Sequence, residues 1–249
     1  MIADSFNSAG DIFASLMTFI GNRIASVPND EDHNLGHGKA EYIFSMFISI
    51  AMILVAAKLL FDSISSLVSG EKLSFSWFLI LVCIITIVTK LCLYLYTRSI
   101  NKKHPSILLE ANMKDHRNDC VITTFTLISV ILTIFGIYWF DGVVGIGISL
   151  WICYTGITIF TESYNVLMDI SIDSKTKDLI LEIAHSYKEI QDVKDIVSTP
   201  VGDRYLVFIT IGLDGNMTTF ESHSLADELE QSVTKLDNVY KTVVHVEPQ

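Results

Sequence analysis

Residues 77–88 read Trp-Phe-Leu-Ile-Leu-Val-Cys-Ile-Ile-Thr-Ile-Val, an apolar run that only Thr86 interrupts and that carries no charge. The run belongs to a segment of approximately 75–97, which is long enough to cross a lipid bilayer, because a crossing takes about 20 residues of helix. Four further segments are of comparable length: approximately 2–21, 41–68, 108–139 and 143–168. The sequence therefore predicts a polytopic α-helical membrane domain with five helices.

The apolar character ends near residue 170. The whole chain is 50% hydrophobic with a mean hydropathy of +0.45, but its last part reads as a soluble sequence. The elements expected there are a helix over 174–187, strands over 193–199 and 205–213, a helix that Ser222 caps and that runs to 236, and a strand over 242–246. This αββαβ order predicts a small α/β domain. We therefore divide the chain into a membrane domain, 1–169, and a C-terminal domain, 170–249.

Acidic residues dominate the C-terminal domain, with 14 Asp and Glu against 7 Lys and Arg, within a net charge of −11 for the chain. The chain has no basic stripe that could meet phosphates, so we expect no nucleic-acid partner. An acidic surface suits cations, although it is also a common way of keeping a protein soluble.

Basic residues mark the side of the membrane on which the loops lie. Two or more occur in each of the loops 22–40 and 98–107, whereas 69–74 has one and 140–142 has none. The positive-inside rule therefore places the first two loops and the C-terminal domain in the cytoplasm. Five spans then leave the N-terminus on the opposite side, so we expect a further helix upstream of Met1.

The two least apolar spans carry polar residues at a matched spacing. Asn7 and Asp11 lie four residues apart in the first span, as do Asp115 and Asp119 in the fourth. Residues spaced i, i+4 emerge from one helix face a turn apart. An ionisable residue inside a span costs roughly 2.5–3.5 kcal/mol and is functional by default. Two such helices packed together would present four oxygen ligands to a divalent cation, which would neutralise the carboxylates.

Two other interpretations concern the surroundings of this site. Both pairs could be helix ends that face water, with Lys114 and Arg117 neutralising the second pair. His116 lies about 100° around the helix from Asp115, so we expect it on a neighbouring face. Oxygen ligands suit hard ions such as Mn²⁺, whereas imidazole and thiolate favour Zn²⁺. Zn²⁺ and Fe²⁺ bind most sites with higher intrinsic affinity than Mn²⁺, and oxygen ligands reduce this difference without removing it. Manganese is therefore favoured only slightly.

Three motifs give the chain a family resemblance. Residues 3–16 are similar to the second transmembrane helix of the cation diffusion facilitators. Residues 32–41, Asp-His-Asn-Leu-Gly-His-Gly-Lys-Ala-Glu, resemble the family's loop motif before its third helix, and residues 115–119, Asp-His-Arg-Asn-Asp, its fifth-helix motif. The ordered set covers the whole chain. The resemblance implies a homodimeric metal/proton antiporter with six helices, of which the first is missing here, and a cytoplasmic metallochaperone-like domain.

The resemblance also implies a metal preference and a second site. Zinc carriers of the family usually have His where Asp115 stands, so the chain looks like the manganese-exporting branch. A family site in the loop would consist of Asp30, His33 and His37. The alternative is a loop that Gly36 and Gly38 hold in shape while the histidines face water.

A third family site would lie in the C-terminal domain, formed by His223, His245 and Glu247. Gln191 and Gly212 stand where zinc members often have histidines, which makes this site a depleted one. Lys39 and Asp169 occupy places where family members have charges that help to link the membrane and cytoplasmic parts. Independent contact of each side chain with the bilayer surface is the alternative.

Metal binding requires ionised carboxylates, so metal and protons compete for one site. The chain has no ATP motif, and we expect neither an enzyme nor a bound cofactor. The predicted function is Mn²⁺ export by alternating-access antiport, in a bacterial plasma membrane. A Zn²⁺ or Fe²⁺ exporter is the nearest alternative. A non-transporting regulatory subunit is a further alternative, which only the missing helix favours. An intramembrane aspartyl hydrolase would need two carboxylates that share a proton rather than i, i+4 pairs that include an Asn.

Overall fold

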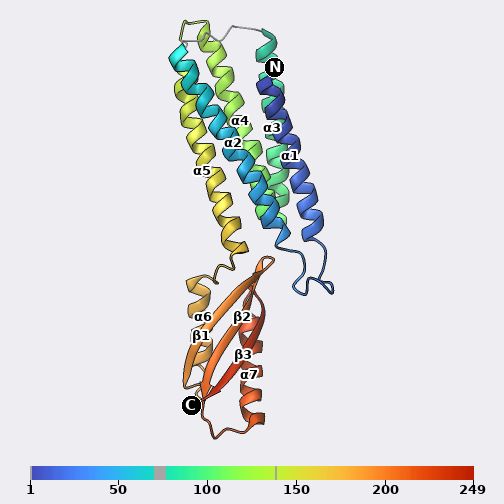
Figure 1. Ribbon diagram of the computed structural model, residues 1–249, viewed down its shortest axis with the longest axis vertical. Coiled ribbons are helices and arrows are strands. Elements are labelled where there is room, and N and C mark those ends of the chain that lie inside the picture. The colour runs from blue at the N-terminus through green and yellow to red at the C-terminus, as the bar shows by residue number, and fades with distance from the viewer. Residues whose placement is uncertain (1, 70–76, 138) are drawn as a thin grey trace. The chain divides into compact units, whose positions relative to one another are not determined.

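A computed structural model describes residues 2–69, 77–137 and 139–249, with the backbone alone for residues 2–11 (Figure 1). The chain forms two compact units. The first consists of Met1–Ala25 and Ala40–Tyr164, and the second of Ser26–Lys39 and Asn165–Gln249. The loop Ser26–Lys39 therefore belongs to the unit of the C-terminal residues rather than to the helices that it joins.

Five long helices make up the first unit: α1 (Ile2–Ala25), α2 (Ala40–Ser69), α3 (Trp77–Lys103), α4 (Ile107–Thr133) and α5 (Trp139–Leu167). They correspond to the five predicted segments. Among the described residues, α2, α3 and α5 are long and apolar enough to cross a membrane. The described apolar part of α1, Ile12–Ala25, is shorter, and α4 does not meet the same test. These are the two helices that carry the predicted site.

The core of the first unit joins four of these helices. Its buried residues come from α1, α2, α4 and α5: Ala14, Ile48, Met52, Ala56, Leu108, Ala111, Ile148, Ile152 and Ile159. Small residues let the helices approach closely, as is usual between membrane helices. A Cβ on Gly156 of α5, for example, would lie 2.8 Å from Cγ1 of Ile53 on α2.

Helix α3 packs in a different way. Its buried residues are Cys83, Lys90 and Thr97, which recur every seventh position and so form one narrow stripe. This stripe faces α4, where the Cys120 Sγ contacts the Ile87 carbonyl oxygen at 3.8 Å. Many of the other side chains of α3, among them Trp77 and Phe78, are exposed apolar groups of the kind that lipid covers.

The second unit contains the predicted αββαβ order: α6 (Ser174–His185), β1 (Asp192–Val201), β2 (Arg204–Leu213), α7 (Thr219–Thr234) and β3 (Val239–Pro248). The strands form one sheet in the order β1-β2-β3, with β1 antiparallel and β3 parallel to β2. Alternate residues of β2, including Val207 and Ile209, share a buried cluster with Ile180 of α6 and Leu229 of α7. Both helices therefore cover one face of the sheet, as Figure 1 shows.

The start of α7 differs from the prediction that Ser222 caps it. Thr218 is the cap: its side chain accepts a hydrogen bond from the Glu221 N–H, and the Glu221 Oε2 accepts one from the Thr218 N–H at 2.9 Å. This reciprocal pair satisfies two backbone donors at the helix start, which a cap at Ser222 would leave inside the helix. The helix is therefore one turn longer at its N-terminus than predicted.

Candidate metal centres

Two acidic residues and a histidine come together in the first half of α4. Ligand atoms of Asp115, His116 and Asp119 all lie within 4.8 Å of one another. His116 and Asp119 are buried, and Asp115 is partly buried. The predicted convergence of Asp115 and Asp119 follows from their i, i+4 spacing on one helix. We refer to these three residues as the intramembrane group.

His116 lies nearer to the two carboxylates than its predicted place on a neighbouring helix face implies. The prediction that His116 lies on a neighbouring face rested only on the angle of about 100° between His116 and Asp115 around the helix axis. His116 is also three residues before Asp119, and residues spaced i, i+3 are neighbours on a helix surface. An imidazole is therefore within reach of the same point as the two carboxylates.

The side chains of Asn7 and Asp11 lie outside the residues that the structure describes. Their helix, α1, does pack beside α4. Ala14, one turn after Asp11, shares a buried cluster with Ala111, one turn before Asp115. A Cβ on Gly21 would lie 2.9 Å from Cδ2 of Leu108, which places a second point of α1 against α4.

A lysine outside the predicted site, Lys90, contacts the intramembrane group. The Lys90 ammonium, halfway along α3, donates a hydrogen bond to the Asp119 Oδ2 at 2.6 Å. The two side chains are only 11% and 10% exposed. The signal was present in the sequence, because a lysine in the middle of an apolar span is as costly as an aspartate and equally in need of a partner.

The two basic residues that could have neutralised the pair on α4 have described contacts elsewhere. The Lys114 Nζ lies 2.6 Å from the Glu110 Oε1, one turn back along α4. The Arg117 guanidinium lies 4.6 Å from the centre of the Trp151 ring. The cation that the described structure places on Asp119 comes instead from a neighbouring helix.

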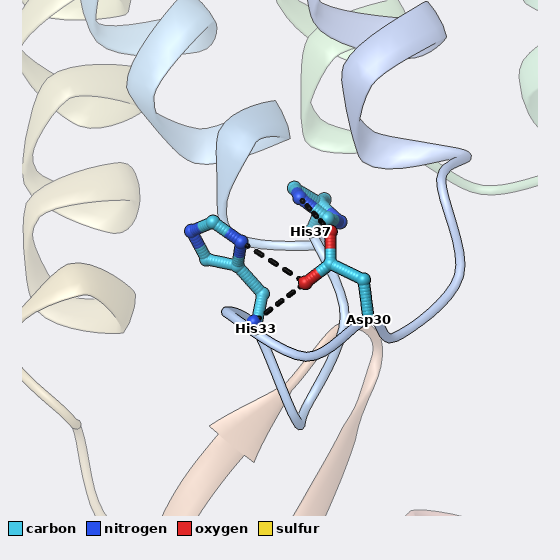
Figure 2. A group of neighbouring side chains, drawn as sticks. All are labelled: Asp30, His33 and His37. Carbon is cyan, nitrogen blue, oxygen red and sulfur yellow. Dashed lines mark hydrogen bonds and ion pairs between the residues drawn. The ribbon is translucent and has the colours of Figure 1, made fainter.

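A second group lies in the loop between α1 and α2, where ligand atoms of Asp30, His33 and His37 lie within 4.8 Å of one another. Figure 2 shows both imidazole rings turned toward the Asp30 carboxylate. The Oδ1 atom is 3.3 Å from the His33 Nδ1, and the Oδ2 atom is 3.5 Å from the His37 Nε2. The structure thus brings the three predicted residues together; we refer to them as the loop group.

Backbone contacts hold the loop group in shape. The Asp30 Oδ1 accepts hydrogen bonds from the His33 N–H at 2.6 Å and the Asp32 N–H at 3.1 Å, the pattern of an Asx turn. The bond from His33 is the main reason that the pKa of Asp30 is lowered. Gly36 has a φ of +77°, a conformation that favours glycine.

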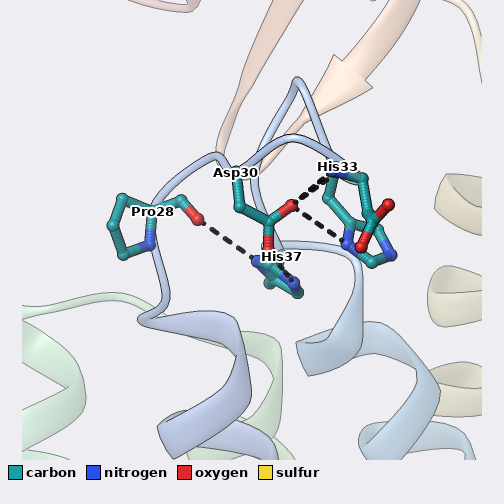
Figure 3. Close-up of polar contacts among 5 residues, drawn as sticks. Pro28, Asp30, His33 and His37 are labelled. Carbon is teal, nitrogen blue, oxygen red and sulfur yellow. Dashed lines mark hydrogen bonds and ion pairs between the residues drawn. The ribbon is translucent and has the colours of Figure 1, made fainter.

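The far side of the His37 ring is also occupied. Its Nδ1 lies 3.3 Å from the Pro28 carbonyl oxygen, as Figure 3 shows. A carbonyl can only accept, so this contact favours the tautomer with its proton on Nδ1 and an electron pair on Nε2. The Nε2 electron pair then faces a carboxylate oxygen, an arrangement that a metal ion between them would satisfy.

An ion pair links this loop to the residues that follow α5. The Lys39 Nζ lies 2.7 Å from the Asp169 Oδ1, which also accepts a hydrogen bond from the Thr199 hydroxyl at 2.6 Å. The hydrogen bond from Lys39, followed by that from Thr199, lowers the pKa of Asp169. The two charges are therefore paired rather than independently placed.

The three residues proposed for a site in the C-terminal domain have other contacts. The His223 Nδ1 lies 3.2 Å from the Asp227 Oδ1 within α7. His245 and Glu247, both on β3, are 4.0 Å apart, and Glu247 pairs with Lys194 at 2.5 Å. The described residues do not bring this trio within 4.8 Å of one another, and a site there stays a prediction.

Ionisable residues buried within membrane helices are typical of proteins that move ions or protons across a bilayer. Residues 1–168 match the family model of the cation efflux transmembrane domain, and residues 172–249 match that of the cytoplasmic domain of cation efflux proteins. The chain belongs to the cation efflux family. It is therefore a divalent-cation efflux transporter and not an enzyme.

Several relatives match over nearly their whole length. An uncharacterised transporter of Methanocaldococcus jannaschii is 29% identical over 99% of this chain and 87% of its own. The manganese efflux system protein MneS of Bacillus subtilis is 30% identical over 100% of this chain and 85% of its own. The cation-efflux pump FieF of Shewanella oneidensis is 28% identical over 100% and 84%.

Proposed function

We propose that this transporter exports Mn²⁺ through a site formed by Asn7, Asp11, Asp115 and Asp119. The observation that carries the proposal is the convergence of the Asp115 and Asp119 carboxylates in the first half of α4. The packing of α1 beside α4 at Ala14 and Ala111 supports the contribution of Asn7 and Asp11. Three carboxylates gathered in a low-dielectric region are stabilised when a divalent cation neutralises them.

The choice of metal rests on the ligand atoms. Three carboxylates and one amide are hard oxygen donors, which suit Mn²⁺. The name of the relative MneS, a manganese efflux system protein, points in the same direction. His116 favours a second candidate, a Zn²⁺ or Fe²⁺ exporter, because its imidazole lies within 4.8 Å of both carboxylates and would suit those ions.

Protons are the proposed counter-ion. A carboxylate must lose its proton to bind metal, so each ion displaces the other from the site. Exposure of the site first to one side of the membrane and then to the other would couple metal export to proton import. The loop group is a proposed second metal site, since its geometry presents one carboxylate and two imidazoles.

The proposed arrangement is a homodimer in a bacterial plasma membrane, with a membrane domain, 1–169, and a C-terminal domain, 170–249, in the cytoplasm. The basic loops 22–40 and 98–107 support this orientation through the positive-inside rule. The match of residues 172–249 to the family's cytoplasmic domain supports the assignment of the C-terminal part.

Efflux of Mn²⁺ from loaded cells tests the site. Asp119→Ala should abolish efflux and manganese tolerance, because it removes one of the proposed ligands. Asp62→Ala is the matched control: this aspartate also lies on a membrane helix, but it is half-exposed and pairs with Lys58 at 3.7 Å. Equal efflux by the wild type and Asp119→Ala would show that the site is wrong.

A second variant tests the metal preference. Asp115→His exchanges an oxygen ligand for a nitrogen ligand, so efflux should shift from Mn²⁺ toward Zn²⁺. The ratio of the two efflux rates in the same vesicles measures the shift. An unchanged ratio would contradict the ligand argument while leaving the position of the site untouched.

A further inference from the structure

Lys90 lies on α3, which is the least buried of the three described helices that are long and apolar enough to cross a membrane. It is halfway along α3 and belongs to the narrow stripe by which that helix packs on α4. Its ammonium contacts the Asp119 Oδ2 at 2.6 Å, and both side chains are about nine-tenths buried. A charge at this depth is retained only where it has a partner and a role.

The contact changes the charge of the proposed transport site. Asp119 offers two oxygens, of which one is held by the ammonium of Lys90. A fixed positive charge at contact distance offsets one carboxylate charge and repels any cation that approaches the same group. Binding to the site is therefore weaker than three carboxylates alone would make it.

A transporter needs such a limit. An ion must bind well enough to load and weakly enough to leave, and a positive charge beside a carboxylate shifts this balance toward release. A lysine is suited to this task, since it brings a compact charge on a long stem from a neighbouring helix.

We propose that Lys90 is a resident counter-cation of the transport site, which holds Asp119 in place and keeps the metal affinity low enough for release. This inference rests on the proposed function, in which Asp119 is a metal ligand. It assigns a positioning role to a residue on a helix that contributes no metal ligand. Lys90 thereby tunes the affinity and the turnover of the carrier rather than its choice of metal.

Calorimetric titration of Mn²⁺ into the purified full chain tests the proposal. All variants carry His33→Ala and His37→Ala, so that the loop group does not contribute. Lys90→Gln keeps a hydrogen-bond donor but loses the charge, so its dissociation constant for Mn²⁺ should fall about tenfold or more. Transport in vesicles should slow in the same variant, because release becomes harder.

Two matched variants isolate the charge. Lys90→Arg keeps the positive charge and should stay close to the affinity of the parent protein. Lys58→Gln removes another paired lysine of a membrane helix, one that pairs with Asp62 at 3.7 Å and is half-exposed, and should change nothing. An unchanged or weaker Mn²⁺ affinity in Lys90→Gln would overturn the proposal.

Thermal unfolding with and without Mn²⁺ separates this role from a structural one. Loss of the counter-cation should lower the melting temperature of the metal-free protein and enlarge the rise that Mn²⁺ produces. An equal loss in both states would mean that Lys90 is structural, and the proposal would be wrong. Lys90→Met removes both the charge and the hydrogen bond. If Lys90→Met does not fold, Lys90→Gln alone distinguishes an effect on metal binding from an effect on folding.

The Asp119→Ala variant separates this proposal from the proposed site. Full Mn²⁺ affinity in Asp119→Ala would refute the site, and the role of Lys90 with it. Loss of affinity in Asp119→Ala together with an unchanged affinity in Lys90→Gln would refute the counter-cation alone.

Discussion

The intramembrane group and the loop group are built from the same residue types, aspartate and histidine, in opposite surroundings. Asp115 and His116 lie one turn before Asp119 on the same helix, and the three residues are mostly buried. In the loop group Asp30 and His33 are exposed, and the geometry comes from an Asx turn and from the positive φ of Gly36. One group is held by a rigid helix, the other by a turn of a few residues.

The two groups differ in how their charge is compensated. Water solvates the loop group and screens its charges, so that group requires no protein cation. The intramembrane group lies where burial makes an uncompensated charge expensive, and a lysine from another helix contacts it. A buried acidic site therefore needs a compensating charge from a residue other than its ligands, whereas the charge of an exposed site is compensated by water.

The largest expected effect separates the two groups by stability. Asp119→Asn removes the charge that Lys90 contacts, so the free energy of unfolding should fall by roughly 3 kcal/mol, as for other buried ion pairs that lose one partner. Asp30→Asn in the loop group should leave the unfolding midpoint unchanged. Denaturation in detergent, followed by circular dichroism, measures both. Similar losses in the two variants would contradict the comparison.

A smaller effect is expected when the loop group loses a ligand. His37→Ala should weaken metal binding at the loop by about 10- to 100-fold, the range seen when a residue that orients or ligates a metal is removed. Equilibrium dialysis should then find one fewer metal ion per chain, while Mn²⁺ efflux continues. His185→Ala, in the last turn of α6, is the control. Loss of efflux in His37→Ala would mean that the two groups are not independent.

The turn itself gives the third prediction. Gly36→Ala puts a side chain on a residue with a φ of +77°, which should cost about 1 kcal/mol and weaken metal binding at the loop severalfold. Gly147→Ala in α5 is a matched control, because a Cβ there would meet nothing within 4 Å. Metal titration of the two variants checks the expectation. An unaffected loop site in Gly36→Ala would show that the turn does not set its geometry.

The smallest effect concerns the ion pair between Lys39 and Asp169. The pKa of Asp169 in the folded chain lies below its ordinary value of 3.8, mainly through the bond from Lys39. The contribution of this pair to stability is therefore fully present above 3.8 and is lost as the pH falls through the lowered pKa. The protection of residues 26–39 against hydrogen–deuterium exchange, measured relative to the intrinsic exchange rate at each pH, should fall only at such low pH.

In the Asp169→Asn variant, the amides of residues 26–39 should exchange faster than in the wild type at neutral pH. Their protection should also change less when the pH is lowered. Asp203→Asn is the control, because its carboxylate is 91% exposed and lies 3.9 Å from Arg204. Faster exchange in α4 as well as in the loop would contradict the independence of the two groups.

Much of the fold follows from local patterns in the sequence. The five long helices coincide with the five predicted segments, and length and hydropathy alone identify α2, α3 and α5 as membrane spans. The order αββαβ follows from the alternation of helical and strand-like periods. The cap of α7 was misplaced because Ser222 and Thr218 are both good caps, and only the reciprocal bond with Glu221 decides between them.

The candidate site was predictable in part. The i, i+4 spacing places Asp115 and Asp119 together because both lie on one helix, and the family's loop motif identified Asp30, His33 and His37. The partner of Asp119 was not predictable in the same way. Which residue of α3 faces α4 depends on how the two helices pack, and no spacing along the chain contains that information.

The stripe of Cys83, Lys90 and Thr97 has a consequence for assembly. An apolar helix that touches its neighbour along one narrow line can slide along it at little cost, since one apolar contact replaces another. A slide of α3 by one helical turn, about 5.4 Å, would carry the Lys90 ammonium out of hydrogen-bond reach of Asp119. The ion pair between Lys90 and Asp119 therefore fixes the position of α3 along the axis of α4, which apolar contacts alone would leave open.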